Sequence, residues 1–131
     1  MLFRSRCLET LSGSGPFTAV PEGAGFFPSA EKPWVFWLGF GDGAARLSEA
    51  AARLAGALRG EGFALDERPF VPHLTLARLK GRVSPAAAAG AAAAAEVLCR
   101  GASFPVTGAV LFSSELFPDG PRYSELKRVD F

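Results

Sequence analysis

The stretch Trp34-Val35-Phe36-Trp37-Leu38-Gly39-Phe40 decides the fold class, because it is the clearest β-strand signal in the chain. It is made of aromatic, β-branched and other apolar residues, and Pro33 and Gly41 bound it. Such runs between turn-forming residues are typical of strands. Its apolar residues fall on both faces, so we expect cover on both sides of this strand, or cover on one side and a cleft wall on the other.

The segments next to this strand predict a helix on one side and an irregular strand on the other. After the strand, apolar residues recur at spacings of three and four and predict a helix that ends at about Arg59. The residues of this stripe are Leu47, Ala50, Ala51, Leu54 and Leu58. Before the strand, residues 17–27 contain Pro21 and glycines among apolar residues, which predicts an irregular edge strand or a bulged one. Residues 1–11 have roughly helical spacing of their apolar side chains.

The C-terminal half continues the mixture of helices and strands. Residues 73–79 alternate as a strand, and Pro85 opens a helix that runs to about Arg100. Residues 104–116 and 123–129 are two further strand regions, with a turn at 118–120 between them. Strands joined as hairpins beside helices predict an α+β fold with a mainly antiparallel sheet, in a single domain that covers residues 1–131.

The composition excludes several classes of protein. About half of the residues are apolar, which is enough for a core, and the formal net charge is +1. Contact with RNA would therefore depend on a local patch and not on overall charge. No apolar run reaches the roughly 20 residues of a membrane-spanning helix. The two cysteines, Cys7 and Cys99, are too few for a disulfide framework, so we expect reduced, structural thiols in a cytoplasmic protein.

His73 is the only histidine in the chain and the main candidate for chemistry. Thr75 follows two residues later, so alternation places both side chains on one face of a strand, about 7 Å apart. An imidazole moves protons near neutral pH, and a hydroxyl can donate to a phosphate oxygen. Alternation places Arg78 on the opposite face with Leu74 and Leu76, so it would add an anion contact only if the strand twists or bulges. The structural alternative is a histidine bonded to a backbone carbonyl.

The segment Pro72-His73-Leu74-Thr75-Leu76-Ala77-Arg78 resembles the second His-x-Thr-x motif of the RNA 2',3'-cyclic phosphodiesterases, also called 2'-5' RNA ligases, in the 2H phosphoesterase superfamily. The short motif is weak evidence alone, but other blocks typical of that family occur in the same order along nearly the whole chain. They are Gly25-Phe26-Phe27-Pro28, Pro33–Gly39, Glu67-Arg68-Pro69-Phe70, Val110–Leu116, Pro118-Asp119-Gly120 and Arg122-Tyr123.

This resemblance implies a two-lobed 2H phosphoesterase fold in which each lobe gives one His-x-Thr-x strand to a central cleft. The implied reaction is hydrolysis of RNA 2',3'-cyclic phosphate ends, or of nucleoside 2',3'-cyclic phosphates, to 2'-phosphomonoesters, without a metal or other cofactor. Matching the motif residue by residue makes His73 the proton acceptor and Thr75 a contact to phosphate oxygens. Arg78 is a weaker match, as a substrate-binding residue.

The family's first motif has no counterpart, because the chain has no second histidine. We therefore expect a partial two-lobed fold that is N-terminally incomplete, with little or no activity by itself, since losing one of two proton-transfer groups costs roughly 10²- to 10⁴-fold in rate. A non-catalytic RNA-end or nucleotide-binding remnant is the alternative, and a fragment that does not fold independently is a third. Exposed sheet edges also predict self-association of the chain.

The aromatic residues of 34–40 allow two interpretations. They could stack on RNA bases, as aromatic side chains do in many RNA-binding proteins. They alternate through an apolar strand, however, so we interpret them as core residues, with one face available to line a cleft.

Overall fold

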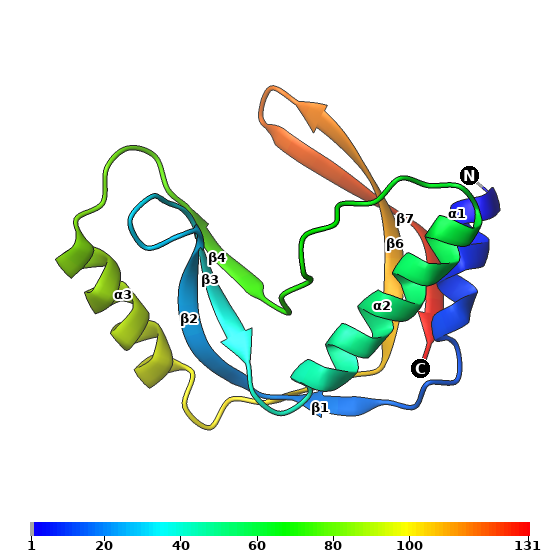
Figure 1. The fold of residues 1–131 in the computed structure, drawn as a ribbon, viewed down its shortest axis with the longest axis horizontal. Coiled ribbons are helices and arrows are strands. Elements are labelled where there is room, and N and C mark those ends of the chain that lie inside the picture. The colour runs from blue at the N-terminus through cyan, green and yellow to red at the C-terminus, as the bar shows by residue number, and fades with distance from the viewer. Residues whose placement is uncertain (1) are drawn as a thin grey trace. The chain divides into compact units, whose positions relative to one another are not determined.

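The computed structural model describes the backbone of residues 2–131 and the side chains from Arg4 onward. The predicted α+β class is confirmed, because the helices accompany sheets whose longer strands pair antiparallel (Figure 1). The chain forms two compact units. The first contains the N-terminal residues through Phe17, Glu49–Pro69 and Val106–Phe131, and the second contains Thr18–Ser48 and Phe70–Pro105.

The second unit is built on a three-stranded sheet in the order β2-β3-β4, with antiparallel neighbours. Its strands are β2 (Pro21–Pro28), β3 (Pro33–Phe40) and β4 (Leu74–Arg78). Helix α3 (Pro85–Leu98) packs beside β2. The Ser84 hydroxyl caps this helix by accepting a hydrogen bond from Ala87 N over 3.1 Å, and Pro85 occupies its first turn as predicted.

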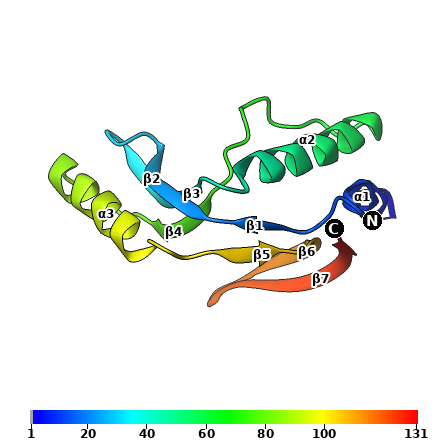
Figure 2. The ribbon, with the colours of Figure 1, turned by 90° about the horizontal axis from the view of Figure 1, so that it is seen from below.

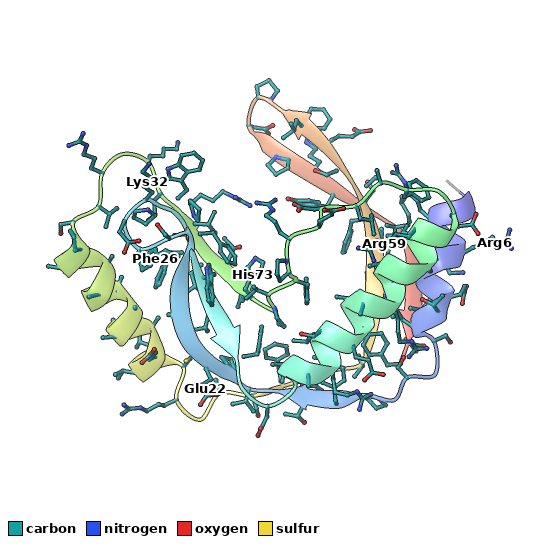
Figure 3. The ribbon with its side chains drawn as sticks, in the orientation of Figure 1. Arg6, Glu22, Phe26, Lys32, Arg59 and His73 are labelled. Carbon is teal, nitrogen blue, oxygen red and sulfur yellow. The ribbon has the colours of Figure 1, made fainter. Side chains whose placement is uncertain are left out.

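The two faces of this sheet differ. Phe26 pairs with Phe36 across the strands and stacks on it at 4.9 Å between ring centroids. Alternation then puts Phe27 and Trp37 on the other face. In Figure 3, Phe26 points toward α3 and His73 lies on the opposite side of the sheet. The helix of this unit therefore leaves the His73 face free.

A β-bulge in β4 changes which of its residues share a face. Thr75 lies opposite Trp37, but Ala77 lies opposite Phe36, so Leu76 has no partner across the ladder. Arg78 then lies opposite Val35. The expected alternation of residues 73–79 is thus wrong beyond Leu76, because an extra residue moves every later side chain to the other face.

The first unit packs helices against a long hairpin (Figure 2). It contains α1 (Leu2–Leu8), a 3-10 helix η1 (Glu9–Leu11) and the part of α2 (Ala44–Gly60) from Glu49 onward. Strands β6 (Gly108–Phe117) and β7 (Gly120–Asp130) form the hairpin, with Pro118 and Asp119 at its turn. The core is centred on Leu8, Leu11 and Val129. Partly buried residues around it are Ala50, Leu54, Ala109, Leu111 and Phe131.

Two short strands complete the fold, and they show where sequence patterns mislead. Strand β1 (Phe17–Ala19) pairs with β5 (Phe104–Val106). The predicted strands at 17–27 and 104–116 are therefore each two strands, broken at Val20 and at Thr107.

The remaining elements follow the predictions closely. The strand at 34–40 and the helices ending near Arg59 and Arg100 are confirmed, and the last strand is longer than predicted. The predicted helix at 1–11 is α1 followed by η1, and its first residue, Met1, lies outside the described residues. The interpretation of Trp34 as a core residue is wrong, because 68% of its surface is exposed at the start of β3.

Candidate active site

His73 lies immediately before β4 with its side chain exposed (Figure 3). Its Nδ1 is 2.7 Å from the backbone carbonyl oxygen of Val71. A carbonyl oxygen only accepts hydrogen bonds, so Nδ1 must carry the hydrogen. The neutral ring then keeps its lone pair on Nε2, which has no hydrogen-bond partner among the described residues. The backbone contact of the structural alternative is therefore present, and it leaves Nε2 free to accept a proton.

Two aromatic rings from neighbouring strands surround this imidazole. Phe27 meets the His73 ring edge-on, with centroids 5.0 Å apart and an interplanar angle of 89°. Trp37 also approaches it edge-on, at 6.3 Å and 65°. Phe27 and Trp37 stack on each other at 4.9 Å. The His73 ring is thus one of three mutually contacting rings.

Thr75 and Arg78 lie on the same face of the sheet as His73. Their partners on β3, Trp37 and Val35, are two residues apart and so point the same way. Each step from His73 to Thr75 and from Thr75 to Arg78 therefore spans about two residues of strand, or roughly 7 Å. Both side chains are exposed, and none of the ion pairs in the described part of the chain involves Arg78.

This row of side chains offers a proton acceptor, a hydroxyl donor and a guanidinium fork on one exposed surface. Hydroxyl and guanidinium groups are the donors that bind phosphate oxygens, and Arg does so with two parallel hydrogen bonds. In the described residues, no cluster of three or more His, Cys, Asp or Glu side chains is arranged to hold a metal ion. The arrangement on this face is suited to an anion that also needs proton transfer.

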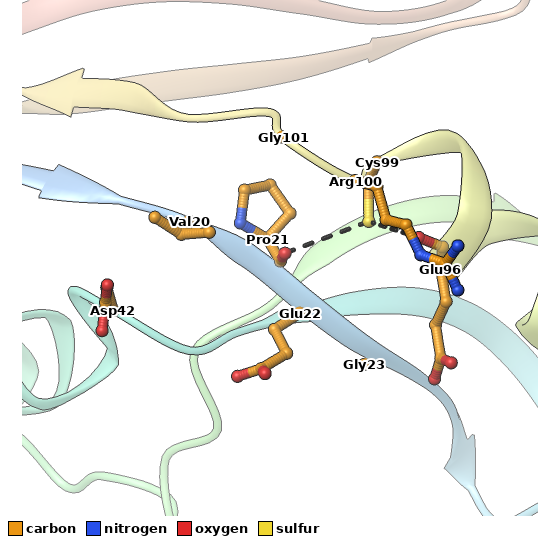
Figure 4. Close-up of a pocket in the computed structure, with 9 residues that line it drawn as sticks. All are labelled: Val20, Pro21, Glu22, Gly23, Asp42, Glu96, Cys99, Arg100 and Gly101. Atoms are coloured by element: carbon orange, nitrogen blue, oxygen red, sulfur yellow. Dashed lines mark hydrogen bonds between the residues drawn. The ribbon is translucent and has the colours of Figure 1, made fainter.

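A separate cavity of about 490 Å³ lies elsewhere in the second unit (Figure 4). Its lining residues are Val20, Pro21, Glu22, Gly23, Asp42, Glu96, Cys99, Arg100 and Gly101. The Cys99 thiol donates weakly to the Pro21 carbonyl at 3.9 Å and to the Glu96 carbonyl at 3.6 Å. His73, Thr75 and Arg78 are not part of this cavity.

Sequence reasoning named a bulge only as a condition for a contact by Arg78, and it missed the rings around His73. The bulge depends on pairing with β3, which the residues of β4 do not encode by themselves. The ring contacts had a local signal, because Phe27 and Trp37 stand in two apolar strands that a hairpin joins. That signal gives no indication of which face the rings occupy. Of the helices in the described residues, none combines the length and the hydropathy that spanning a membrane requires.

Residues 41–123 match the family described as LigT like Phosphoesterase. The matched range includes β4 and both strands of the β6–β7 hairpin as far as Tyr123. It is well over half of the chain.

Several curated relatives are named RNA 2',3'-cyclic phosphodiesterase. One from Thermus thermophilus is 36% identical over 120 residues, which are 86% of this chain and 54% of the relative. One from Methanothermobacter thermautotrophicus is 35% identical over 122 residues, 91% of this chain and 63% of the relative. Across the relatives found, the chain spans between 20% and 63% of their length.

Solved structures of similar proteins also superpose on most of this chain. The structure of TT0787 from Thermus thermophilus superposes with a TM-score of 0.61 at 32% identity, covering 88% of this chain and 61% of that one. The apo structure of Escherichia coli LigT superposes with a TM-score of 0.66 at 26% identity, covering 97% of this chain and 67% of that one. A further structure of that E. coli protein holds 3'-AMP.

Proposed function

The chain belongs to the LigT-like phosphoesterase family, and on this premise we propose that it acts on 2',3'-cyclic phosphate at RNA 3' ends and on nucleoside 2',3'-cyclic phosphates. The proposed reaction is hydrolysis to a 2'-phosphomonoester. The observation that carries the proposal is the placement of His73, Thr75 and Arg78 on one exposed face, with the Nδ1 hydrogen of His73 directed to the Val71 carbonyl. The names of the relatives support the same substrate class.

In the proposed reaction, water attacks the phosphorus atom while Nε2 of His73 accepts the proton that this water loses. The bond between phosphorus and the 3' oxygen breaks, and the 3' oxygen takes up a proton. Thr75 and Arg78 donate hydrogen bonds to the non-bridging oxygens, where negative charge grows in the transition state. The hydrogen bond from Nδ1 to the Val71 carbonyl favours the tautomer that leaves the lone pair on Nε2.

The proton for the 3' oxygen has no imidazole source in this chain, because His73 is the only histidine. The leaving oxygen would have to take its proton from solvent. Loss of a positioned acid typically lowers a rate by roughly 10²- to 10⁴-fold. We therefore expect turnover by this chain to fall below that of the Thermus thermophilus relative by a factor in that range.

The test is an assay of cytidine 2',3'-cyclic phosphate hydrolysis, with product regiochemistry determined by phosphorus NMR. We expect slow formation of the 2'-phosphate by wild type and none above background by His73→Gln, which keeps a polar side chain but cannot act as a base at neutral pH. Lys80→Gln, a charge change beyond the end of β4, is the matched control. Equal rates for wild type and His73→Gln would contradict the proposal.

A non-catalytic role in binding nucleotides or RNA ends is the second candidate, and the single imidazole favours it. Such a chain would bind 2'-AMP on the His73 face without turning over the cyclic phosphate. Titration of 2'-AMP while the His73 ring resonances are followed separates the two. Ring shifts without any hydrolysis support the binding role, and hydrolysis that depends on His73 supports the enzyme.

We also propose that the chain associates with itself. Strands β2 and β4 are the edges of their sheet, which favours strand pairing between chains. Exposed apolar side chains such as Leu116 on β6, which is 87% exposed, favour association through apolar surface. Sedimentation at several concentrations tests this, and a monomer at all of them contradicts it.

We propose a cytoplasmic location as well. The thiols of Cys7 and Cys99 are free, and a reducing compartment such as the cytoplasm would keep them so.

A further inference from the structure

The environment of the His73 ring leads to an inference about residues that do not themselves touch the phosphate. We propose that Phe27 and Trp37 are positioning residues for His73. We also propose that Gly25, which has no side chain, leaves the space in which the Trp37 indole is held. The inference rests on the proposed function, in which Nε2 of His73 accepts a proton.

A single hydrogen bond does not fix an exposed imidazole. The bond from Nδ1 to the Val71 carbonyl, 2.7 Å long, anchors one atom of the ring. The ring can still turn about that anchor, and in solution it can exchange its hydrogen between the two nitrogens. Contacts on the ring plane are needed to select one orientation and, with it, one tautomer.

Phe27 and Trp37 supply those contacts. The edge-on geometries, 5.0 Å for Phe27 and 6.3 Å for Trp37, lie in the range in which aromatic pairs attract each other. The two rings also stack on each other at 4.9 Å, so each restrains its neighbour. Phe27 lies on β2 and Trp37 on β3, so the two rings keep their positions as long as the sheet keeps its structure.

Packing against the backbone of β2 in turn holds the Trp37 indole in place. A Cβ on Gly25 would lie 2.8 Å from Cη2 of Trp37 and closer still to Cζ2. The indole therefore lies directly on the backbone of β2, in space that any larger residue at position 25 would fill. Its Nε1 is buried with no hydrogen-bond partner among the described residues, so packing and not a hydrogen bond sets its position.

The test uses the full chain labelled with ¹⁵N, in which the single histidine gives one set of imidazole signals. Long-range ¹H–¹⁵N spectra, recorded well above the ordinary imidazole pKa of about 6.5, report the ratio of the two tautomers. We expect wild type to hold its hydrogen mainly on Nδ1. We expect Gly25→Ala, which changes none of the three rings, to lower the Nδ1–H to Nε2–H ratio about two- to tenfold, as the loss of one aromatic contact would.

Gly90→Ala is the matched control, because a Cβ there meets nothing within 4 Å, and it should leave the ratio unchanged. Phe27→Leu provides a second route to the same result if Gly25→Ala does not fold. Trp37→Phe, which keeps a ring, should preserve more of the wild-type ratio than Trp37→Leu.

An unchanged tautomer ratio in folded Gly25→Ala or Phe27→Leu would overturn the inference. So would the absence, in wild type, of nuclear Overhauser contacts between the Phe27 and His73 rings, a measurement that needs no variant. Hydrolysis is assayed separately. If the tautomer effect is present and hydrolysis is not, the proposed function fails and the positioning role of these residues stands.

Discussion

Arg78 lies on the same face of the sheet as Thr75, although three positions along the strand would ordinarily put two side chains on opposite faces. The unopposed residue Leu76 between them accounts for this, since Thr75 faces Trp37 and Arg78 faces Val35. The guanidinium therefore joins the hydroxyl and the imidazole as the third polar group on one surface.

The first prediction concerns phosphate affinity at Arg78. Arg78→Gln should weaken binding of 2'-AMP about 10- to 100-fold, because a charge-assisted pair of hydrogen bonds is lost. Arg78→Lys should recover part of the affinity, since it keeps the charge and loses the fork. Isothermal titration calorimetry measures both, with Lys80→Gln as the control. Unchanged affinity in Arg78→Gln would place the phosphate elsewhere.

The second prediction tests whether the Thr75 hydroxyl, and not the rest of its side chain, contacts the phosphate. Thr75→Val keeps the volume and β-branching that suit a strand and removes only the donor. We expect about a tenfold loss of 2'-AMP affinity and unchanged thermal stability, since the side chain is exposed. Thr75→Ser should restore most of the binding. Full affinity in Thr75→Val together with a loss in Thr75→Ser would mean that the methyl group, and not the hydroxyl, makes the contact.

The third prediction is a pH effect in the segment before β4. Hydrogen bonds from the Arg68 side chain and backbone lower the pKa of Asp66 from 3.8 to about 2. Because the pKa is lower in the folded state, this interaction stabilises the fold above about pH 4, and the stabilisation is lost as the pH falls toward 2. Carbon NMR of the Asp66 carboxyl group should show this depressed pKa.

Arg68→Gln is the matching variant, and the pKa of Asp66 should return toward 3.8 in it. The two side chains are 87% and 57% exposed, so salt should weaken the effect. An Asp66 pKa that does not change in Arg68→Gln would show that the pair is not formed in solution.

The fourth prediction concerns stability. Leu11 is 3% exposed in the core of the first unit, and Leu11→Ala should lower the free energy of unfolding by about 2–5 kcal/mol. Leu98, at the end of α3, is 85% exposed, and Leu98→Ala should change it by less than about 0.5 kcal/mol. Urea denaturation followed by circular dichroism compares them. Similar losses in both variants would mean that Leu11 is not a core residue.

Local signals in the sequence predicted most of the secondary structure, because each depends on neighbouring residues. The apolar run at 34–40, the stripe that ends near Arg59, and Pro85 in a first helical turn each correspond to an observed element. The polar groups His73 and Thr75 were likewise predicted to share a face, and their spacing of two in an extended segment was sufficient for that.

Features that depend on contacts between distant segments were not predictable in the same way. The face occupied by Arg78 follows from the pairing of β4 with β3, more than thirty positions away in the sequence. The exposure of Trp34 depends on its place at the end of a strand, and the rings beside His73 depend on which face of the sheet α3 covers. No pattern within a single segment contains that information.

Because Leu76 is unopposed, the face that the arginine occupies depends on how this segment pairs with its neighbour and not on its composition alone. Deleting that one leucine would remove the bulge and leave the threonine and the arginine two positions apart, and a regular strand would still point both side chains to one face. The site should therefore tolerate loss of the leucine better than a change that keeps the leucine but pairs it regularly with β3, because regular pairing would turn the arginine toward the α3 side.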